Sequence, residues 1–476
     1  MIAGYYGFKI FVDTDKQALL IGEASYGHYQ IELTCTACHS EPFGGPELIQ
    51  DACLSCHENE LDAAHDSHPK KKFNDPRNAD LLEIIDARYC VSCHTEHQKE
   101  QTLAMGLTIP EDYCFHCHED IGKDRPSHQD LAFDSCASAG CHNYHDNRAL
   151  YEDFLLKNSS GHWLNAIAKI GSANDINRSA IAAAKKSNPT DSVKFERKIQ
   201  EYPQIHSQWL NSAHAGIMSI NTPDEKDLLS SQVDAKPAET TALSSQSNTD
   251  TSKANVNCGG CHTDDTGQWL VHPGVEQCQT CHSGETKGFL QGKHGLRLAH
   301  GLSSITPGES YLPMKGETLD TGHSCVACHG AHDFNTRRAA QDSCLDCHND
   351  QHSLAFKQSP HGQLFDKANK GEIPLEQSVS CATCHMPRLP VSTGSGGNTY
   401  IVEHNQNLNL RPNEKMIRPV CMQCHSLGFA IDALADDALI KNNFTGQPSV
   451  HIPSIDWVLK REKKEELQQI PSNDTD

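Results

Sequence analysis

Cysteine and histidine carry the chemistry of this chain, because they recur together in one short motif. Ten copies of Cys-x-x-Cys-His use all but two of the 22 cysteines. The last two, Cys136 and Cys141, form a stretched copy in which four residues separate the thiols and His142 follows. In an exported protein this motif attaches haem c: both thiols bond to the porphyrin, and the adjacent histidine ligates the iron.

Three other uses of paired cysteines compete with this interpretation. Disulfides suit a secreted cysteine-rich chain, and Cys-x-x-Cys pairs also build zinc sites and redox-active dithiols. None of these needs a histidine directly after the second cysteine. Histidine makes up only 30 of 476 residues, so eleven such histidines do not arise by chance.

The sequence therefore predicts eleven covalently attached haem c groups. The attachment cysteines are Cys35 with Cys38, Cys53 with Cys56, Cys90 with Cys93, Cys114 with Cys117, Cys136 with Cys141, Cys258 with Cys261, Cys278 with Cys281, Cys325 with Cys328, Cys344 with Cys347, Cys381 with Cys384, and Cys421 with Cys424. The proximal iron ligands are His39, His57, His94, His118, His142, His262, His282, His329, His348, His385 and His425.

The histidines outside these motifs are numerous enough to give each iron a second, distal imidazole. Imidazole is a good neutral ligand whose other ring nitrogen is oriented by a nearby acceptor. The predicted distal ligands are His68, His97, His128, His145, His162, His214, His294, His323, His332, His352, His361 and His404. Histidines ranked behind them are His28, His65, His272 and His300. His116 lies inside a motif and His451 is expected at the surface, so neither is predicted as a ligand.

Two local patterns mark the stronger candidates. In the first, small or short residues precede the histidine, as at Ser160-Gly161-His162 and Ser212-Ala213-His214, and leave room for a flat ring. The second is Cys-His-x-x-His, at His97, His145 and His332. One helical turn between its two imidazoles would direct them at different haems, so this pattern predicts haems linked into chains.

The amino-acid composition limits which secondary-structure elements can position these groups. Only 37% of residues are hydrophobic, which is low for a chain of 476 residues. Eleven haems would supply the missing apolar core. We therefore expect a mostly α fold with extensive loops wrapped around haems, and little β structure.

The net charge of the chain limits the kinds of macromolecule that it can bind. The net charge of −22 argues against nucleic acid, which binds to basic surfaces. It suits docking to basic redox proteins, and the alternative is that the acidity only keeps a haem-dense protein soluble.

The order of motifs predicts a division into modules. Five motifs fall in residues 25–150 and six in residues 257–435. Between them, 151–220 is expected to form helices that cap haems. Residues 221–256 lack aromatic residues and histidine, and read as a flexible linker. A tail, 436–476, follows.

Haem c attachment implies export to the periplasm or to the outer face of the cytoplasmic membrane. Segment 1–24 opens with MIAGYYGFKIFV, which is too short to span a bilayer. Its aromatic residues resemble the interfacial end of a membrane helix, so it is interpreted as the tail of an N-terminal anchor. The alternative is a non-native or mis-assigned start on a soluble periplasmic protein.

The second half resembles the hydroxylamine-oxidoreductase-like multihaem cytochromes. The resemblance rests on QWLNSAHA, FLQGKHGLRLAHG, CVACHGAHDF, CLDCHNDQHSLAFKQSPHG, SCATCHMPR and EHNQNLNLRPNEKMIRPVCMQCH. It implies closely spaced haem pairs, in proteins that carry electrons or that convert nitrite, hydroxylamine, tetrathionate or sulfite. Catalytic members carry a proximal lysine or a tyrosine cross-link. This chain has no Cys-x-x-Cys-Lys, and no tyrosine lies beyond its last motif. The first half resembles the small multihaem cytochromes of the class III type.

The expected function is electron transfer along bis-histidine haems. The donor would be a membrane protein, such as one that oxidises quinol, and the acceptor a periplasmic protein or an outer-membrane conduit. Two alternatives stay open. One is a reductase or oxidase of a small nitrogen or sulfur oxyanion at one open haem, and the other is a subunit of a larger extracellular conduit.

Overall fold

The computed structural model describes most of the two motif-rich regions. The described residues are 8, 16–41, 44–99, 106–110, 112–125, 128–129, 132–133, 136, 142–146, 152–161, 201–210, 212, 214, 258–316, 323–393, 397–410 and 413–469. Most of the predicted anchor segment, the predicted linker 221–256, Cys141 and His162 lie outside them. The predictions made for those residues stay predictions.

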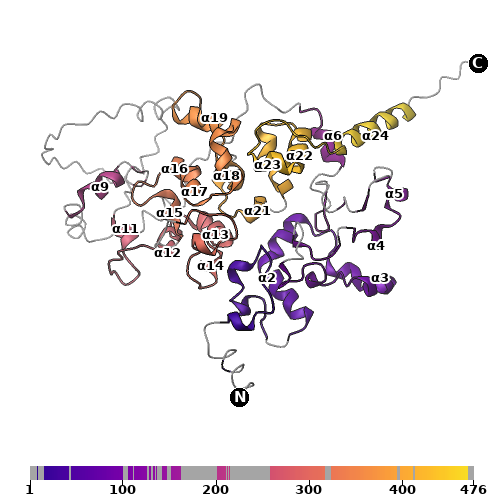
Figure 1. The fold of residues 1–476 in the computed structure, drawn as a ribbon, viewed down its shortest axis with the longest axis horizontal. Coiled ribbons are helices and arrows are strands. Elements are labelled where there is room, and N and C mark those ends of the chain that lie inside the picture. Colours follow the sequence, from indigo (N-terminus) through magenta and orange to yellow (C-terminus); the bar gives the residue numbers. More distant parts are fainter. Residues whose placement is uncertain are drawn as a thin grey trace, which may run out of the picture. The chain divides into compact units, whose positions relative to one another are not determined.

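Short helices joined by long loops make up the first of two compact units, which comprises Met1–Asn174, Lys287–His323 and Ala339–Asp476 (Figure 1). Its helices are α2 Pro46–Ala64, α3 Ala79–Ile84, α4 Phe115–His118, α5 Ile121–Asp124, α6 Glu152–Asn158, α14 Leu296–Ala299, α17 Asp342–Cys347, α18 Gln351–Ala355, α19 Pro360–Asn369, α20 Cys381–His385, α21 Asn407–Leu410, α22 Leu427–Ala435, α23 Asp437–Lys441 and α24 Ser454–Gln469.

The second unit comprises Asp175–Thr286 and Ser324–Arg338. Its helices are α9 Pro203–Leu210, α11 Cys258–His262, α12 Val275–Gln279 and α15 Cys325–His329. Two further helices, α13 Ser283–Gln291 and α16 Thr336–Ala340, span the points where the chain passes from one unit to the other.

Side-chain caps begin several of the helices near the later motifs. Ser359 Oγ accepts a hydrogen bond from Gly362 N at 3.1 Å, and Pro360 supplies the first residue of α19. The carboxylates of Asp350 and Asp436 accept from backbone N–H groups at the starts of α18 and α23 in the same way. Such caps satisfy backbone donors that have no partner inside the helix, so they fix where each short helix starts.

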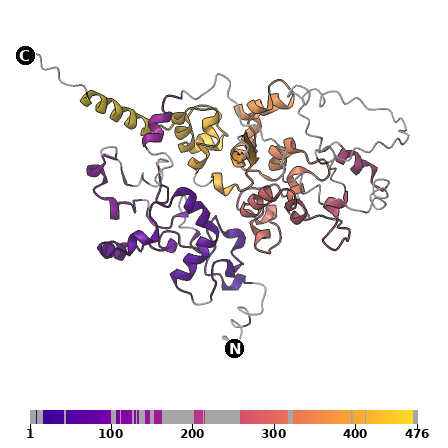
Figure 2. The same cartoon turned by 180° about the vertical axis from the view of Figure 1, so that it is seen from behind.

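An apolar cluster holds α6, α22 and α24 together. Leu427 and Ala430 of α22 and Ile417 before it are almost fully buried, and they pack with Leu155 of α6 and Val458 of α24. In both views α6 lies beside α24, although the two are far apart in the sequence (Figure 1, Figure 2).

The described β structure is one antiparallel hairpin. Strand β1, Arg388–Thr393, pairs with β2, Gly397–Val402, in the register that sets Arg388 opposite Val402. The prediction of a mostly helical, loop-rich fold with little β structure is confirmed. Within the described part of the chain, no helix has the length and apolar character needed to cross a bilayer.

Shortening a buried leucine in the apolar cluster should destabilise the protein. Leu427 is fully buried, so Leu427→Ala should lower the free energy of unfolding by about 2–5 kcal/mol, because it leaves a cavity. Guanidinium unfolding of the haem-loaded protein, followed by far-ultraviolet circular dichroism, measures this. Ile21→Ala is the control: the side chain is 90% exposed, and its loss should change stability by less than about 0.5 kcal/mol. Equal effects of the two variants would contradict the packing described.

Candidate functional site

The Cys-x-x-Cys-His motifs in the described part of the chain have helical backbones, most of them as one turn, while the motif from Cys53 to His57 lies within the longer helix α2. The backbone N–H of the motif histidine donates to the carbonyl of the first cysteine, at 2.8 Å for His39, His94 and His425. Motifs such as those of α11, α15 and α20 form one-turn α-helices, and others form 3₁₀ turns. Residues three and four apart lie on one face of a helix. Both thiols and the imidazole are therefore presented from the same side of the turn.

Nine motif histidines in the described part of the chain face a second histidine across a constant gap. Their ring centroids are 5.9–6.3 Å apart. The pairs are His57 with His28, His118 with His68, His94 with His145, His142 with His128, His282 with His214, His262 with His332, His348 with His294, His385 with His352, and His425 with His361.

This gap matches the space that one iron needs between two imidazoles. A metal–nitrogen bond of about 2 Å, plus about 1 Å from that nitrogen to the ring centre, gives about 6 Å between two rings on opposite sides of one metal. The described residues therefore fit a haem iron with two axial histidines. Most of the partners in these pairs are residues that the sequence analysis predicts as distal ligands.

The outer ring nitrogens are held by hydrogen bonds. Nδ1 of His68 lies 2.6 Å from the Tyr144 carbonyl, and Nδ1 of His262 lies 2.7 Å from the Leu270 carbonyl. A proton on Nδ1 leaves Nε2 as the metal-binding atom and fixes the ring orientation. At His352, Asn443 Nδ2 lies 3.3 Å from Nε2, so an iron there would replace this contact.

Burial favours the neutral, metal-binding form of several of the paired imidazoles. Desolvation lowers the pKa of His294 to about 3, and it lowers the pKa of His214, His361 and His385 to about 4. The positive charge of a neighbouring histidine adds to the effect in each case. These four imidazoles therefore remain unprotonated near neutral pH.

The Cys-His-x-x-His pattern does bring different motifs together. Its backbone, however, does not form the helical turn that was expected between the two histidines. His145 faces His94, and His332 faces His262, so the second histidine of one motif approaches the proximal histidine of another. The expected helical turn is wrong for His97 and His332, whose backbones are left-handed, with φ of 63° and 73°. The helical turn of each motif ends before this residue: α15 ends at His329, and the 3₁₀ turn of the other motif spans Cys90–Ser92.

Cysteine thiols of consecutive motifs also lie close together. The thiols of the first cysteines of neighbouring motifs lie close enough to shift each other's pKa, as at Cys53, whose pKa is raised, and Cys90, whose pKa is lowered. The same arrangement joins Cys114 with Cys136, Cys278 with Cys325, and Cys344 with Cys381. Because each thiol is the attachment point of a porphyrin edge, edges attached to such a pair of sulfurs would lie side by side.

Some of the predicted distal ligands do not belong to these nine pairs and have other neighbours. His323 stacks on His294 with ring centroids 5.3 Å apart, so His294 is close to both His323 and His348. Nδ1 of His97 lies 3.0 Å from the Gly22 carbonyl, and Nδ1 of His404 lies 2.9 Å from the Val402 carbonyl.

His28 is the histidine that the sequence analysis ranked too low. It faces the proximal His57 with ring centroids 6.0 Å apart. A signal was present, because Gly27 directly before it gives the same small-residue pattern as at His162 and His214. His65, ranked alongside it, ends α2 in a left-handed conformation, with φ of 60°.

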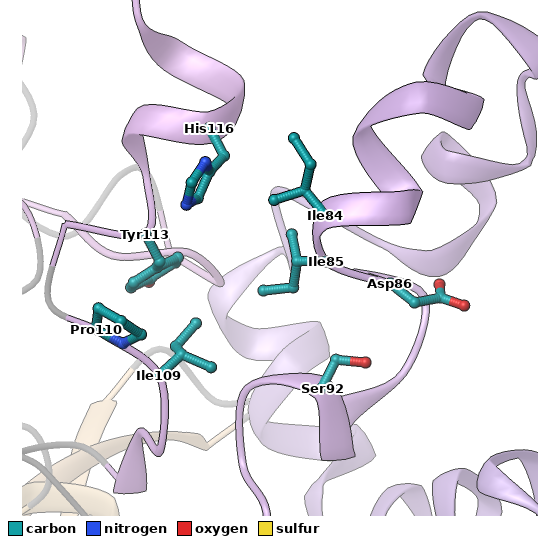
Figure 3. A pocket seen from close by; sticks show the side chains of 8 residues that line it. All are labelled: Ile84, Ile85, Asp86, Ser92, Ile109, Pro110, Tyr113 and His116. Carbon is teal, nitrogen blue, oxygen red and sulfur yellow. The ribbon is translucent and has the colours of Figure 1, made fainter.

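A mostly apolar pocket of about 360 Å³ lies beside two of the motifs. Figure 3 shows Tyr113 and His116 on one side of it, and Ile84 and Ile85 on the other. Asp86 at its edge is paired with Arg88, with Oδ2 and NH2 2.8 Å apart. His116, which is not predicted as a ligand, is one of the residues that line this pocket.

Two regions of the chain match a known protein family. Residues 27–119 and 318–392 match the family model described as cytochrome c3. The first region covers the motifs from Cys35 to His118, and the second covers those from Cys325 to His385. No curated protein matches the chain. The repeated motif, the spacing of the histidine pairs and these two matches, which cover less than half of the chain, together support a multihaem c-type cytochrome with covalently bound haem.

Proposed function

We propose that this protein carries electrons along eleven haems that are each held by two histidines. The observation that supports it best is the constant gap of about 6 Å between proximal and distal rings. Bound haem exchanges single electrons between its ferric and ferrous states. The chain supplies the two axial imidazoles, the thiols that fix the ring, and the backbone acceptors that orient each histidine.

Paired imidazoles favour electron transfer over catalysis. If the two histidines of each pair hold one haem iron, both positions at which a substrate could bind the metal would be filled. Burial lowers the pKa of His294, His361 and His385, so the neutral form that could bind iron is favoured near neutral pH. Fixed ligands also reduce the structural change that accompanies each change of oxidation state.

Contacts between motifs support a connected path. The neighbouring thiols of Cys53 and Cys90, and of Cys344 and Cys381, would bring porphyrin edges together. Histidines contributed by one motif to another, such as His145 and His332, add through-bond links.

The same proposal extends to the cellular location of the protein and to its redox partners. Haem c is attached outside the cytoplasm, so the chain works in the periplasm or at the outer face of the cytoplasmic membrane, where an N-terminal anchor would hold it. Its net charge of −22 favours a basic docking surface on its redox partners. A quinol-oxidising membrane protein is the proposed donor, and a periplasmic protein or an outer-membrane conduit is the proposed acceptor.

Electron paramagnetic resonance of the oxidised, haem-loaded protein tests this function. We expect low-spin signals alone, because every iron would have two imidazole ligands. A high-spin signal near one iron in eleven, changed by nitrite, hydroxylamine or sulfite, would sink the proposal. It would favour instead an oxyanion reductase or oxidase of the hydroxylamine-oxidoreductase-like kind.

The number of haems can be tested at the stretched motif. Replacing both thiols, in the double variant Cys136→Ser and Cys141→Ser, should reduce the covalent haem content from eleven to ten, because no sulfur remains to hold the ring. Intact mass spectrometry after denaturation counts the groups. A wild-type chain that carries ten would show that the four-residue spacer does not attach haem.

Removal of one distal histidine should open one iron. His361→Ala deletes the ring that faces His425, so one low-spin signal should be replaced by a high-spin signal of about one iron in eleven. His451→Ala is the matched control. His451 is 61% exposed and is held by Asp432 and Asp456, so its loss should leave the resonance spectrum unchanged.

A further inference from the structure

One histidine pair has an unusual electrostatic environment. At the pair formed by His28 and His57, both Nδ1 atoms contact carboxylates. His28 Nδ1 lies 2.6 Å from Glu96 Oε1, and His57 Nδ1 lies 3.4 Å from Glu60 Oε2. The pair formed by His94 and His145 differs, because His94 Nδ1 contacts the neutral carbonyl of Gly106.

Glu96 is held firmly against His28. Its carboxylate accepts hydrogen bonds from the Ser25 N–H and from the Ser25 hydroxyl, both at 2.8 Å. Its side chain is 31% exposed, so solvent screens its charge only in part. Both carboxylate oxygens of Glu96 therefore have hydrogen-bond partners, Oε2 from the Ser25 N–H and Oε1 from the Ser25 hydroxyl and His28, which suits the ionised carboxylate.

A carboxylate at this position acts on an axial ligand in two ways. As an acceptor for Nδ1–H it makes the imidazole more basic, so Nε2 donates more electron density to a bound iron. As a fixed negative charge in a partly desolvated site it favours ferric iron, which carries one more positive charge than ferrous iron. Both effects lower the reduction potential, and hydrogen bonds around the ligands are a recognised means of tuning it.

We propose that Glu96 is a positioning residue that lowers the reduction potential of the haem attached at Cys53 and Cys56, with a weaker contribution from Glu60. The longer distance at Glu60 is the reason for ranking it second. The inference rests on the proposed function only in taking His28 and His57 as the axial ligands of this haem.

The position of this haem makes its potential important. Gly27 and Gln30, on either side of His28 and Tyr29, accept hydrogen bonds from Lys293 and Arg297, each at 3.3 Å. Tyr29 also stacks on Tyr311 with ring centroids 4.0 Å apart. Lys293 directly precedes His294, the partner of a proximal histidine from the second group of motifs. Glu96 thus tunes a haem that would lie where the two groups of motifs meet.

The test is potentiometric titration of the full, haem-loaded chain, followed by electron paramagnetic resonance. In Glu96→Gln, one one-electron component should move to higher potential, and one low-spin signal should show larger g anisotropy because its ligand field is weaker. The remaining components should stay in place. Glu23→Gln is the matched control: it removes one negative charge close by, but Glu23 pairs with Lys99 and not with an axial histidine.

The outcomes separate this inference from the proposed function. Unchanged low-spin signals and potentials in Glu96→Gln would overturn the role of Glu96 and leave the electron carrier intact. An equal shift in Glu23→Gln would also overturn it, because charge in the neighbourhood alone would then be responsible. High-spin iron in the wild-type chain would instead count against the proposed function. If Glu96→Gln does not load haem, Glu96→Asp takes its place: its shorter side chain should weaken the contact with His28 and raise the same component.

Discussion

The fold depends on the approach of two imidazoles, from segments far apart in the chain, to the spacing that one iron spans. His214 and His282 meet in this way, as do His361 and His425. Each such pair closes a long loop, and loop closure costs conformational entropy. The apolar cluster around Leu427 and Ile417 is small for a chain of this length. Metal–ligand bonds would therefore supply much of the energy that folding requires, as in other proteins whose metal sites do not exist in the unfolded chain.

Polar interactions support the same arrangement. Backbone carbonyls such as those of Tyr144 and Leu270 orient histidine rings, while the carboxylates of Glu96 and Asp66 contact others. The chain therefore surrounds chemically similar ligands with different electrostatic environments. A string of identical motifs can in this way hold haems of different potentials, which gives electrons a preferred direction.

Local features of the site were predictable from the sequence, and its long-range features were not. The motif fixes its own geometry, because two thiols and an imidazole within five residues share one helical turn. The mostly helical, loop-rich fold followed from the low apolar content and the many motifs. Which histidine faces which motif depends on tertiary contacts: His128 lies close in sequence to His142, whereas His332 faces the distant His262. The left-handed backbones of His97 and His332 also escaped prediction, because non-glycine residues seldom adopt that conformation.

The two compact units are interleaved along the sequence, and this affects what happens when the peptide chain is cleaved. Residues 1–174, 287–323 and 339–476 belong to one compact unit, and the hydrogen bonds from Lys293 to Gly27 and from Arg297 to Gln30 join the first two of these segments. A single cleavage of the peptide chain between the two groups of motifs would therefore not release an N-terminal fragment. The two pieces would remain associated as a nicked protein, much as a circularly permuted chain keeps its fold with its ends in new places.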